Sequence, residues 1–163
     1  MTETLHIPTT PVLRNSADCE RRWFYGGGVF TWSLNAADTG STFLLVEVAM
    51  QQGKTTPLHT HPADETMYVL EGSIRMHMDG DVHDLEEGGV SMAPRGVPHA
   101  FLVTSPVARV LTLHTPGTCE PFYLAASKPY VEGDDHPIDF DRIRDAGETT
   151  GFMDIVGPPP FAH

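Results

Sequence analysis

Three histidines and one glutamate stand at spacings that let β-strands direct all four side chains at one point. They are His59, His61, Glu65 and His99. His59 and His61 are two residues apart, so both side chains face the same side of an extended strand. Pro62 and Asp64 favour a turn directly after them. Glu65 can then begin the next strand beside the two histidines, and this strand is rich in residues that favour β-structure.

His99 lies far along the chain, after the turn-like stretch 94–98, and only a closed or folded-over sheet brings it back to the other three. Neutral imidazole and carboxylate suit Fe(II), Mn(II), Ni(II), Co(II), Cu(II) or Zn(II), and the absence of thiolate argues against a structural zinc site. Four protein ligands leave room on the metal for water, substrate or O₂. The residues therefore predict one divalent transition metal per chain at a catalytic site.

The order of these residues resembles the two sequence motifs of the cupin superfamily. Gly53-x5-His59-x-His61-x3-Glu65-x6-Gly72 is similar to the first motif at every position, and Gly88-x5-Pro94-x-Gly96-x2-His99 is similar to the second. The second motif usually ends in Asn, where this chain has Val103. The resemblance is to single-domain, metal-binding cupins of the bacterial quercetinase-like type. It implies a conical β-barrel (a double-stranded β-helix, or jelly roll) and a metal held by the same four residues.

Composition agrees with one small all-β domain. The chain has 163 residues, with 15 glycines and 14 prolines, so it contains many turns. Its formal charge of −12 disfavours nucleic acid and anionic membranes as partners. Cys19 and Cys119 are far apart and predict no disulfide framework. The first eleven residues lack the apolar core of a signal peptide, so we expect a cytoplasmic protein.

The pattern along the chain predicts about ten short strands separated by turns, and a helix near the end. The strands are expected over 21–25, 29–34, 42–50, 65–71, 73–78, 81–85, 90–93, 99–104, 108–114 and 120–126. The helix is expected over 138–146, with Gly147 as its stop. Residues 1–20 are expected to form an N-terminal arm, 21–128 the cupin barrel, and 129–163 a C-terminal tail of the same domain.

Alternation along these strands predicts which side chains surround the metal. The predicted pocket residues are Phe30, Met50, Met67, Met76, Phe101, Leu113 and His114. Such an apolar cup favours an aromatic or otherwise hydrophobic ligand, although each residue alone is equally well explained as core. His114 is a candidate hydrogen-bond donor or general base, or simply a histidine at a strand end. Lys54 and Arg95 lie in turns and are expected to be exposed, which disfavours a phosphate substrate.

The resemblance implies a metal-dependent dioxygenase that acts on a small hydrophobic phenol or enol and cleaves a carbon–carbon bond with O₂. The substrate hydroxyl would bind the metal, and Glu65 would accept its proton as the catalytic base. Two alternatives stay open: a non-oxidative isomerase, cyclase or lyase at the same site, and a non-catalytic module that binds a small molecule. Similar cupins are commonly dimers, so we expect a homodimer.

Overall fold

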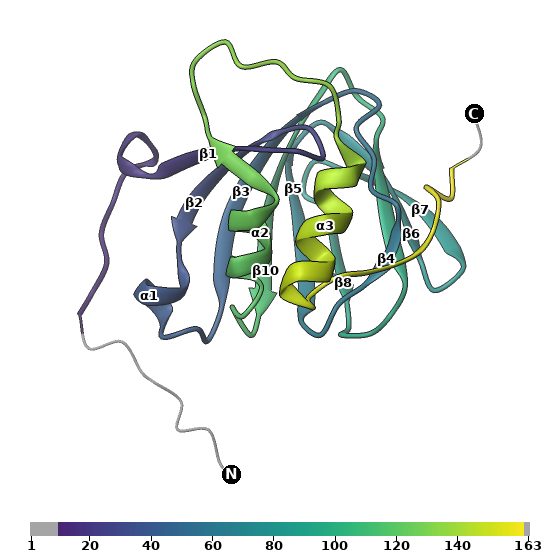
Figure 1. The fold of residues 1–163 in the computed structure, drawn as a ribbon. Helices are drawn as coiled ribbons and strands as arrows, with labels where there is room; N and C mark the ends of the chain where they lie inside the picture. The colour runs from purple at the N-terminus through teal and green to yellow at the C-terminus, as the bar shows by residue number, and fades with distance from the viewer. Residues whose placement is uncertain (1–9, 162–163) are drawn as a thin grey trace.

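Short strands dominate the computed structural model, which describes residues 10–161 (Figure 1). A seven-stranded antiparallel sheet contains, in spatial order, β11 (Ser127–Pro129), β1 (Glu20–Phe24), β2 (Val29–Leu34), β3 (Leu44–Gln51), β10 (Val107–Thr115), β5 (Asp64–Glu71) and β8 (Val90–Ala93). A five-stranded antiparallel sheet contains β12 (Asp154–Gly157), β4 (Leu58–Thr60), β9 (His99–Val103), β6 (Ser73–Met78) and β7 (Asp81–Glu86). This architecture confirms the predicted all-β class.

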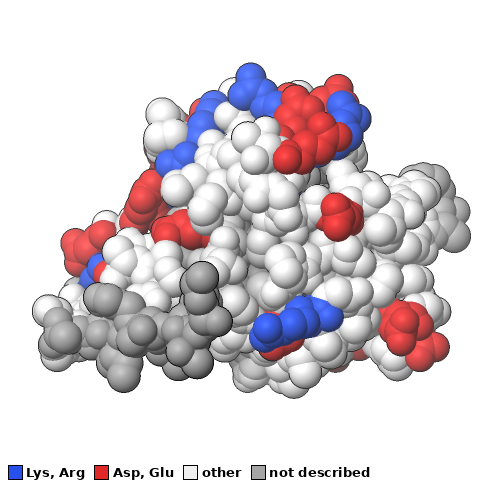
Figure 2. All heavy atoms as spheres, turned by 60° about the horizontal axis from the view of Figure 1, so that its bottom comes forward, with Lys and Arg blue, Asp and Glu red and all other residues white. Residues whose placement is uncertain are grey.

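The core follows from alternation along the strands. On β3, Leu44, Val46, Val48 and Met50 are buried, while the residues between them are partly exposed. Because successive side chains of a strand point to opposite faces, one face of the sheet forms the core and the other faces out. Charged residues lie on the outside. Figure 2 shows Asp and Glu beside Lys and Arg around the edges of one face, with no large patch of a single sign.

The segment 120–126 is a helix, and the strand predicted there is wrong. Helix α2 spans Glu120–Ala125, with a proline in its first turn, where the missing amide hydrogen is no disadvantage. Phe122 and Tyr123 are both buried. Consecutive residues of a strand would face opposite ways, whereas one helical turn against the sheet can bury both. Within residues 10–161, no helix is long and apolar enough to cross a membrane.

Helix α3 spans Phe140–Thr150 and packs against α2 (Figure 1), so the predicted helix exists but ends later than expected. Gly147 does not stop it. A side chain at Gly147 would place its Cβ 2.8 Å from the carbonyl oxygen of Met153, so this glycine allows the returning chain to approach closely. The helix ends at Gly151, whose φ of +65° gives a left-handed cap. A further short helix, α1 (Ala36–Thr39), occupies a segment expected to be a turn.

The described part of the arm contacts the barrel through side chains, whereas the tail adds a strand to a sheet. Of the expected arm 1–20, residues 1–9 lie outside the described residues, and a 3₁₀ turn at Ser16–Asp18 precedes β1. Arg14 in this arm donates two hydrogen bonds to Asp38, at 2.7 and 3.0 Å. The tail contributes β12, which pairs with β4 and so lies next to the predicted metal ligands. The sequence did not predict β11 or β12.

Candidate metal centre

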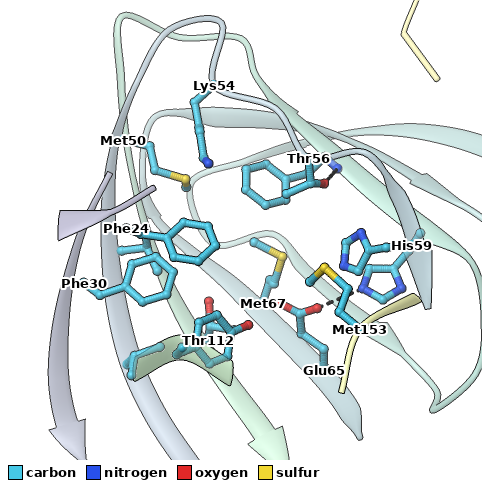
Figure 3. Close-up of a pocket in the computed structure, with 15 residues that line it drawn as sticks. Phe24, Phe30, Met50, Lys54, Thr56, His59, Glu65, Met67, Thr112 and Met153 are labelled. Carbon is cyan, nitrogen blue, oxygen red and sulfur yellow. Dashed lines mark hydrogen bonds and ion pairs between the residues drawn. The ribbon is translucent and has the colours of Figure 1, made fainter. Parts of the chain in front are cut away.

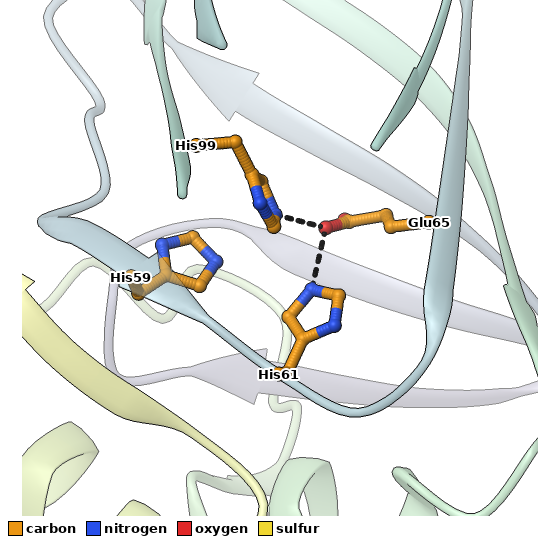
Figure 4. A group of neighbouring side chains, drawn as sticks. All are labelled: His59, His61, Glu65 and His99. Carbon is orange, nitrogen blue, oxygen red and sulfur yellow. Dashed lines mark hydrogen bonds and ion pairs between the residues drawn. The ribbon is translucent and has the colours of Figure 1, made fainter. Parts of the chain in front are cut away.

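Strand pairing brings the four predicted ligands together from both sheets (Figure 4). His59 on β4 lies directly opposite His99 on β9, and residues opposite each other in an antiparallel pair share a face. Glu65 begins the inner face of β5 in the other sheet. His61 follows β4 immediately. Each of the four has an exposed fraction of 9% or less.

The ligand atoms of these residues converge on one point. All four lie within 4.8 Å of one another. Glu65 Oε2 is 3.1 Å from His61 Nε2 and 2.9 Å from His99 Nε2 (Figure 4). Nitrogen and oxygen ligands bind first-row metals at about 2.0–2.2 Å, so opposite ligands of one ion are about 4 Å apart. The separation therefore fits a single metal ion.

The backbone fixes the orientation of each imidazole. The Nδ1 atoms of His59, His61 and His99 lie 2.8 to 2.9 Å from the carbonyl oxygens of Pro57, Ala63 and Val97, respectively. A carbonyl oxygen only accepts, so each Nδ1 carries a proton and donates to the backbone, which leaves each Nε2 facing inward. Such hydrogen bonds orient the histidines of metal sites. Phe152 also stacks on the His61 ring, with the ring centroids 5.2 Å apart.

The chemistry of these four residues fits a bound metal ion. Three inward Nε2 atoms and a carboxylate converge on one buried spot, and imidazole nitrogen with carboxylate oxygen is a set of ligands that first-row divalent metals accept. Burial lowers the pKa of His59 to about 3, so this imidazole is neutral at pH 7. Burial raises the pKa of Glu65, but His114 and the nitrogens of His61 and His99 outweigh it and hold that pKa well below its usual range. Neutral imidazoles beside an ionised carboxylate are the protonation states in which these groups bind metals.

His114 lies behind Glu65 and away from the other three histidines' Nε2 cluster. Its Nε2 is 3.5 Å from Glu65 Oε1 and 3.0 Å from the hydroxyl of Tyr123 on α2. Burial lowers the pKa of His114 to about 4, and burial raises the pKa of Tyr123 well above its usual value. Both groups are therefore neutral at pH 7, with His114 beside the carboxylate and Tyr123 hydrogen-bonded to His114.

An apolar pocket opens beside the four ligands (Figure 3). Of the residues predicted to line it, Phe30, Met50, Met67 and Phe101 do so. Met76 is part of the core, and His114 contacts Glu65 from behind. The prediction for Leu113 is wrong. Leu113 lies between the buried Thr112 and His114 on β10, so its side chain faces the opposite side of the sheet. Thr112 lines the pocket instead.

Several pocket residues were missed by the sequence reasoning. Lys54, expected to be exposed, is buried and lines the pocket, which corrects that expectation, whereas Arg95 is exposed as expected. Tyr123 was hidden by the wrong strand prediction for 120–126. Met153 comes from the tail, whose path the sequence did not indicate. Phe24 also lines the pocket, and the alternation of side-chain directions along its strand could have predicted this.

Comparisons with known proteins agree with the resemblance to cupins. Residues 46–114 match the family model described as cupin domain. The chain is 27% identical over 158 residues to quercetin 2,3-dioxygenase of Bacillus subtilis (strain 168), a match that covers 95% of this chain and 47% of that protein. The chain thus spans about half the length of this curated relative.

Solved structures show the fold. KdgF from Halomonas sp. is similar with a TM-score of 0.60 and 19% identity, over 66% of this chain and 94% of that chain. Oxalate decarboxylase from Bacillus subtilis is similar with a TM-score of 0.59 and 21% identity, over 78% of this chain and 34% of that chain. Together with the two sheets, these likenesses confirm the predicted jelly-roll barrel.

Proposed function

Because residues 46–114 are a cupin domain, we propose that this chain is a metal-dependent dioxygenase acting on a small hydrophobic phenol or enol. The observation that carries the proposal is the convergence of His59, His61, Glu65 and His99 at one side of an apolar pocket. The similarity to quercetin 2,3-dioxygenase over 95% of the chain supports this reaction class. A dioxygenase consumes O₂ and leaves both of its oxygen atoms in the products.

The chain's own residues would prepare the substrate for reaction. A divalent metal held by the four ligands would supply Lewis acidity, which lowers the pKa of a substrate hydroxyl and stabilises its anion. Glu65 lines the pocket as an ionised carboxylate and would accept the hydroxyl proton at a carboxylate oxygen. His114 lies behind that carboxylate, with its Nε2 3.5 Å from Oε1. The apolar lining excludes water from the resulting electron-rich anion.

The size of the pocket limits the substrate. Its free volume is about 50 Å³, which is room for only a few water molecules. Pockets for drug-sized ligands are roughly 300–1,000 Å³. A one-ring phenol or a smaller enol therefore requires less movement of lining side chains such as Met153 than a flavonol does. We accordingly propose a compound of one ring or less as the substrate.

Metal content tests the first half of the proposal. Elemental analysis of freshly purified wild type should find about one metal ion per chain, and His61→Ala should lose it because one of four ligands is removed. His83→Ala is the matched control, since His83 is exposed on β7. Wild-type protein that stays below one ion per chain after addition of each candidate metal, with His61→Ala unchanged, would contradict the proposal and favour a metal-free binding module.

Oxygen uptake tests the second half. The same proton transfer would also begin a cyclisation, isomerisation or elimination, and those reactions use no O₂. One-ring phenols and enols should therefore be screened with an oxygen electrode, in air and under anaerobic conditions. Turnover that stops without O₂ supports a dioxygenase, and turnover that continues without it assigns a non-oxidative reaction.

We further propose a homodimer located in the cytoplasm. Support for the dimer comes from Tyr68, Val90 and Met92, exposed apolar side chains on strand β5 and the edge strand β8. Tyr68 lies directly opposite Val90, and Met92 is two residues along the same strand, so the three share the outer face. Light scattering during gel filtration should give twice the chain mass for wild type and the mass of one chain for Val90→Asp.

A further inference from the structure

Lys54 reaches the pocket from a position that the backbone fixes firmly. It follows the turn after β3, and its amide donates to the carbonyl of Gln51 at 3.2 Å. Its own carbonyl accepts from the amide of Val103 at 2.8 Å. The side chain extends inward from this anchored backbone, and the exposed fraction of Lys54 is only 6%. Figure 3 shows its nitrogen above the apolar part of the pocket, with Glu65 and His59 at the other side.

The lysine nitrogen occupies space beside Gly26 that a side chain at position 26 would fill. A Cβ on Gly26 would lie 2.6 Å from Lys54 Nζ and 2.5 Å from Phe24 Cε1. Glycine at position 26 therefore makes room for the ammonium group. The nitrogen also lies 5.1 Å from the centroid of the Phe24 ring, within the range of a cation–π contact.

Nothing in the described part of the chain pairs with this nitrogen. Among residues 10–161, Lys54 Nζ is buried and has no hydrogen-bond partner. A buried, unpaired ammonium destabilises a protein, and a cation–π contact offsets this only in part. Burial accordingly lowers the pKa of Lys54 to about 7. Packing gives no reason for a lysine here, but a ligand that brings an acidic oxygen into the pocket would supply the missing partner.

We propose that Lys54 binds a carboxylate of the substrate, so that the substrate is a small phenolic or enolic carboxylic acid. Its hydroxyl lies at Glu65 and its carboxylate at Lys54, with an apolar part between them against Met50, Met67 and Phe101. Lys54 is the one lysine or arginine among the residues that line this pocket in the described chain. The position of the substrate hydroxyl rests on the proposed function. The position of the substrate carboxylate rests only on the geometry of Lys54.

Binding of two matched probes tests the inference. The probes are 4-hydroxybenzoate and its neutral analogue 4-methylphenol, measured by calorimetry with metal-loaded and metal-stripped protein. Wild type should bind 4-hydroxybenzoate about 10-fold or more tightly than 4-methylphenol, as a hydrogen bond to a charged group predicts. Lys54→Met should lose this preference. Lys128→Met should keep it, because Lys128 lies at the surface beside Asp134.

A second measurement uses wild-type protein and does not depend on the folding of a variant. The sequence contains two lysines, Lys54 and Lys128, so protein labelled with ¹³C only at lysine Cε shows two signals. Adding 4-hydroxybenzoate should shift the Lys54 signal and leave that of Lys128 in place. 4-Methylphenol should shift the Lys54 signal much less.

The outcomes separate this inference from the proposed function. Equal affinity of wild type for the two probes, or an unshifted Lys54 signal, overturns the carboxylate site even if the protein binds metal and consumes O₂. The same preference in Lys54→Met as in wild type also overturns it. A preference that persists in metal-stripped protein supports the site, and it does so even where the metal and oxygen tests contradict the dioxygenase.

Discussion

Glu65 and His114 are register partners on β5 and β10, and His114 Nε2 lies 3.5 Å from Glu65 Oε1. The opposite oxygen, Oε2, faces His61 and His99. The carboxylate thus lies between His61 and His99, which converge on the candidate metal position, and His114, which does not. Residues outside the ligand set, His114 and Tyr123, therefore adjoin the proposed base. Substitutions can separate their effects from those of the metal ligands.

Glu65→Gln should remove the proton acceptor while keeping the shape of the side chain. We expect kcat to fall by about 100-fold or more, because general base catalysis contributes roughly 10²–10⁴-fold. Metal content should be measured in the same samples, and kcat should be compared at equal metal occupancy. Glu71→Gln is the control, because Glu71 lies on the same strand but is exposed. Unchanged kcat at full occupancy would contradict the assignment of Glu65.

Tyr123→Phe should weaken metal binding without removing a ligand. Its hydroxyl lies 3.0 Å from His114 Nε2, so the substitution loosens the group that supports Glu65. Loss of such an outer partner typically lowers metal affinity or activity by about 10–100-fold. Competition with a chelator measures the affinity, with Tyr130→Phe on the surface as the control. Equal affinities for Tyr123→Phe and wild type would show that this hydroxyl has no role at the metal site.

Phe152→Ala should destabilise the fold and weaken metal binding together. Phe152 is buried, stacks on His61 and lies 5.6 Å, centroid to centroid, from Phe122. Removing a buried phenylalanine ring costs about 3–5 kcal/mol of unfolding free energy. Phe140→Ala should cost less, because Phe140 on the same tail is 41% exposed whereas Phe152 is 6% exposed. Denaturant unfolding of metal-free protein measures both, and equal losses would contradict the role of Phe152.

The sequence predicted the four candidate ligands because strand geometry constrains them locally. A spacing of two residues places His59 and His61 on one side, and the turn at 62–64 returns the chain for Glu65. His99 is distant in the sequence, so its position beside the other three could be predicted only from the fold that the second motif implies. The pocket was harder to predict, because the alternation on β10 had to be assigned to one of two faces. Leu113 was assigned to the pocket, but the buried set includes Thr112 and His114.

The remaining differences arise where tertiary contacts override local patterns. Phe122 and Tyr123 favour strands, yet they form one helical turn because both are buried against the sheet. Gly147 is a common helix stop, yet here it allows Met153 to approach the helix. Lys54 follows a turn and so was expected to be exposed. Its burial depends on Gly26 and Phe24, which are nearly 30 residues earlier in the chain and cannot be placed beside it from the sequence.

Lys54→Met should make the metal-free protein more stable at neutral pH and remove a pH dependence. Burial lowers the pKa of Lys54 from 10.5 to about 7, so between these values the unfolded chain binds more protons than the folded one. The contribution of Lys54 to the free energy of unfolding, measured as wild type minus Lys54→Met, should therefore rise from about pH 7 to 10.5 by at most ~1.4 kcal/mol per pH unit and stay level below pH 7. Lys54→Met should lack this rise and exceed wild type most at and below pH 7, whereas Lys128→Met should follow wild type. Parallel profiles for wild type and Lys54→Met would show that Lys54 keeps an ordinary pKa, and hence that its ammonium already has a partner in the folded chain.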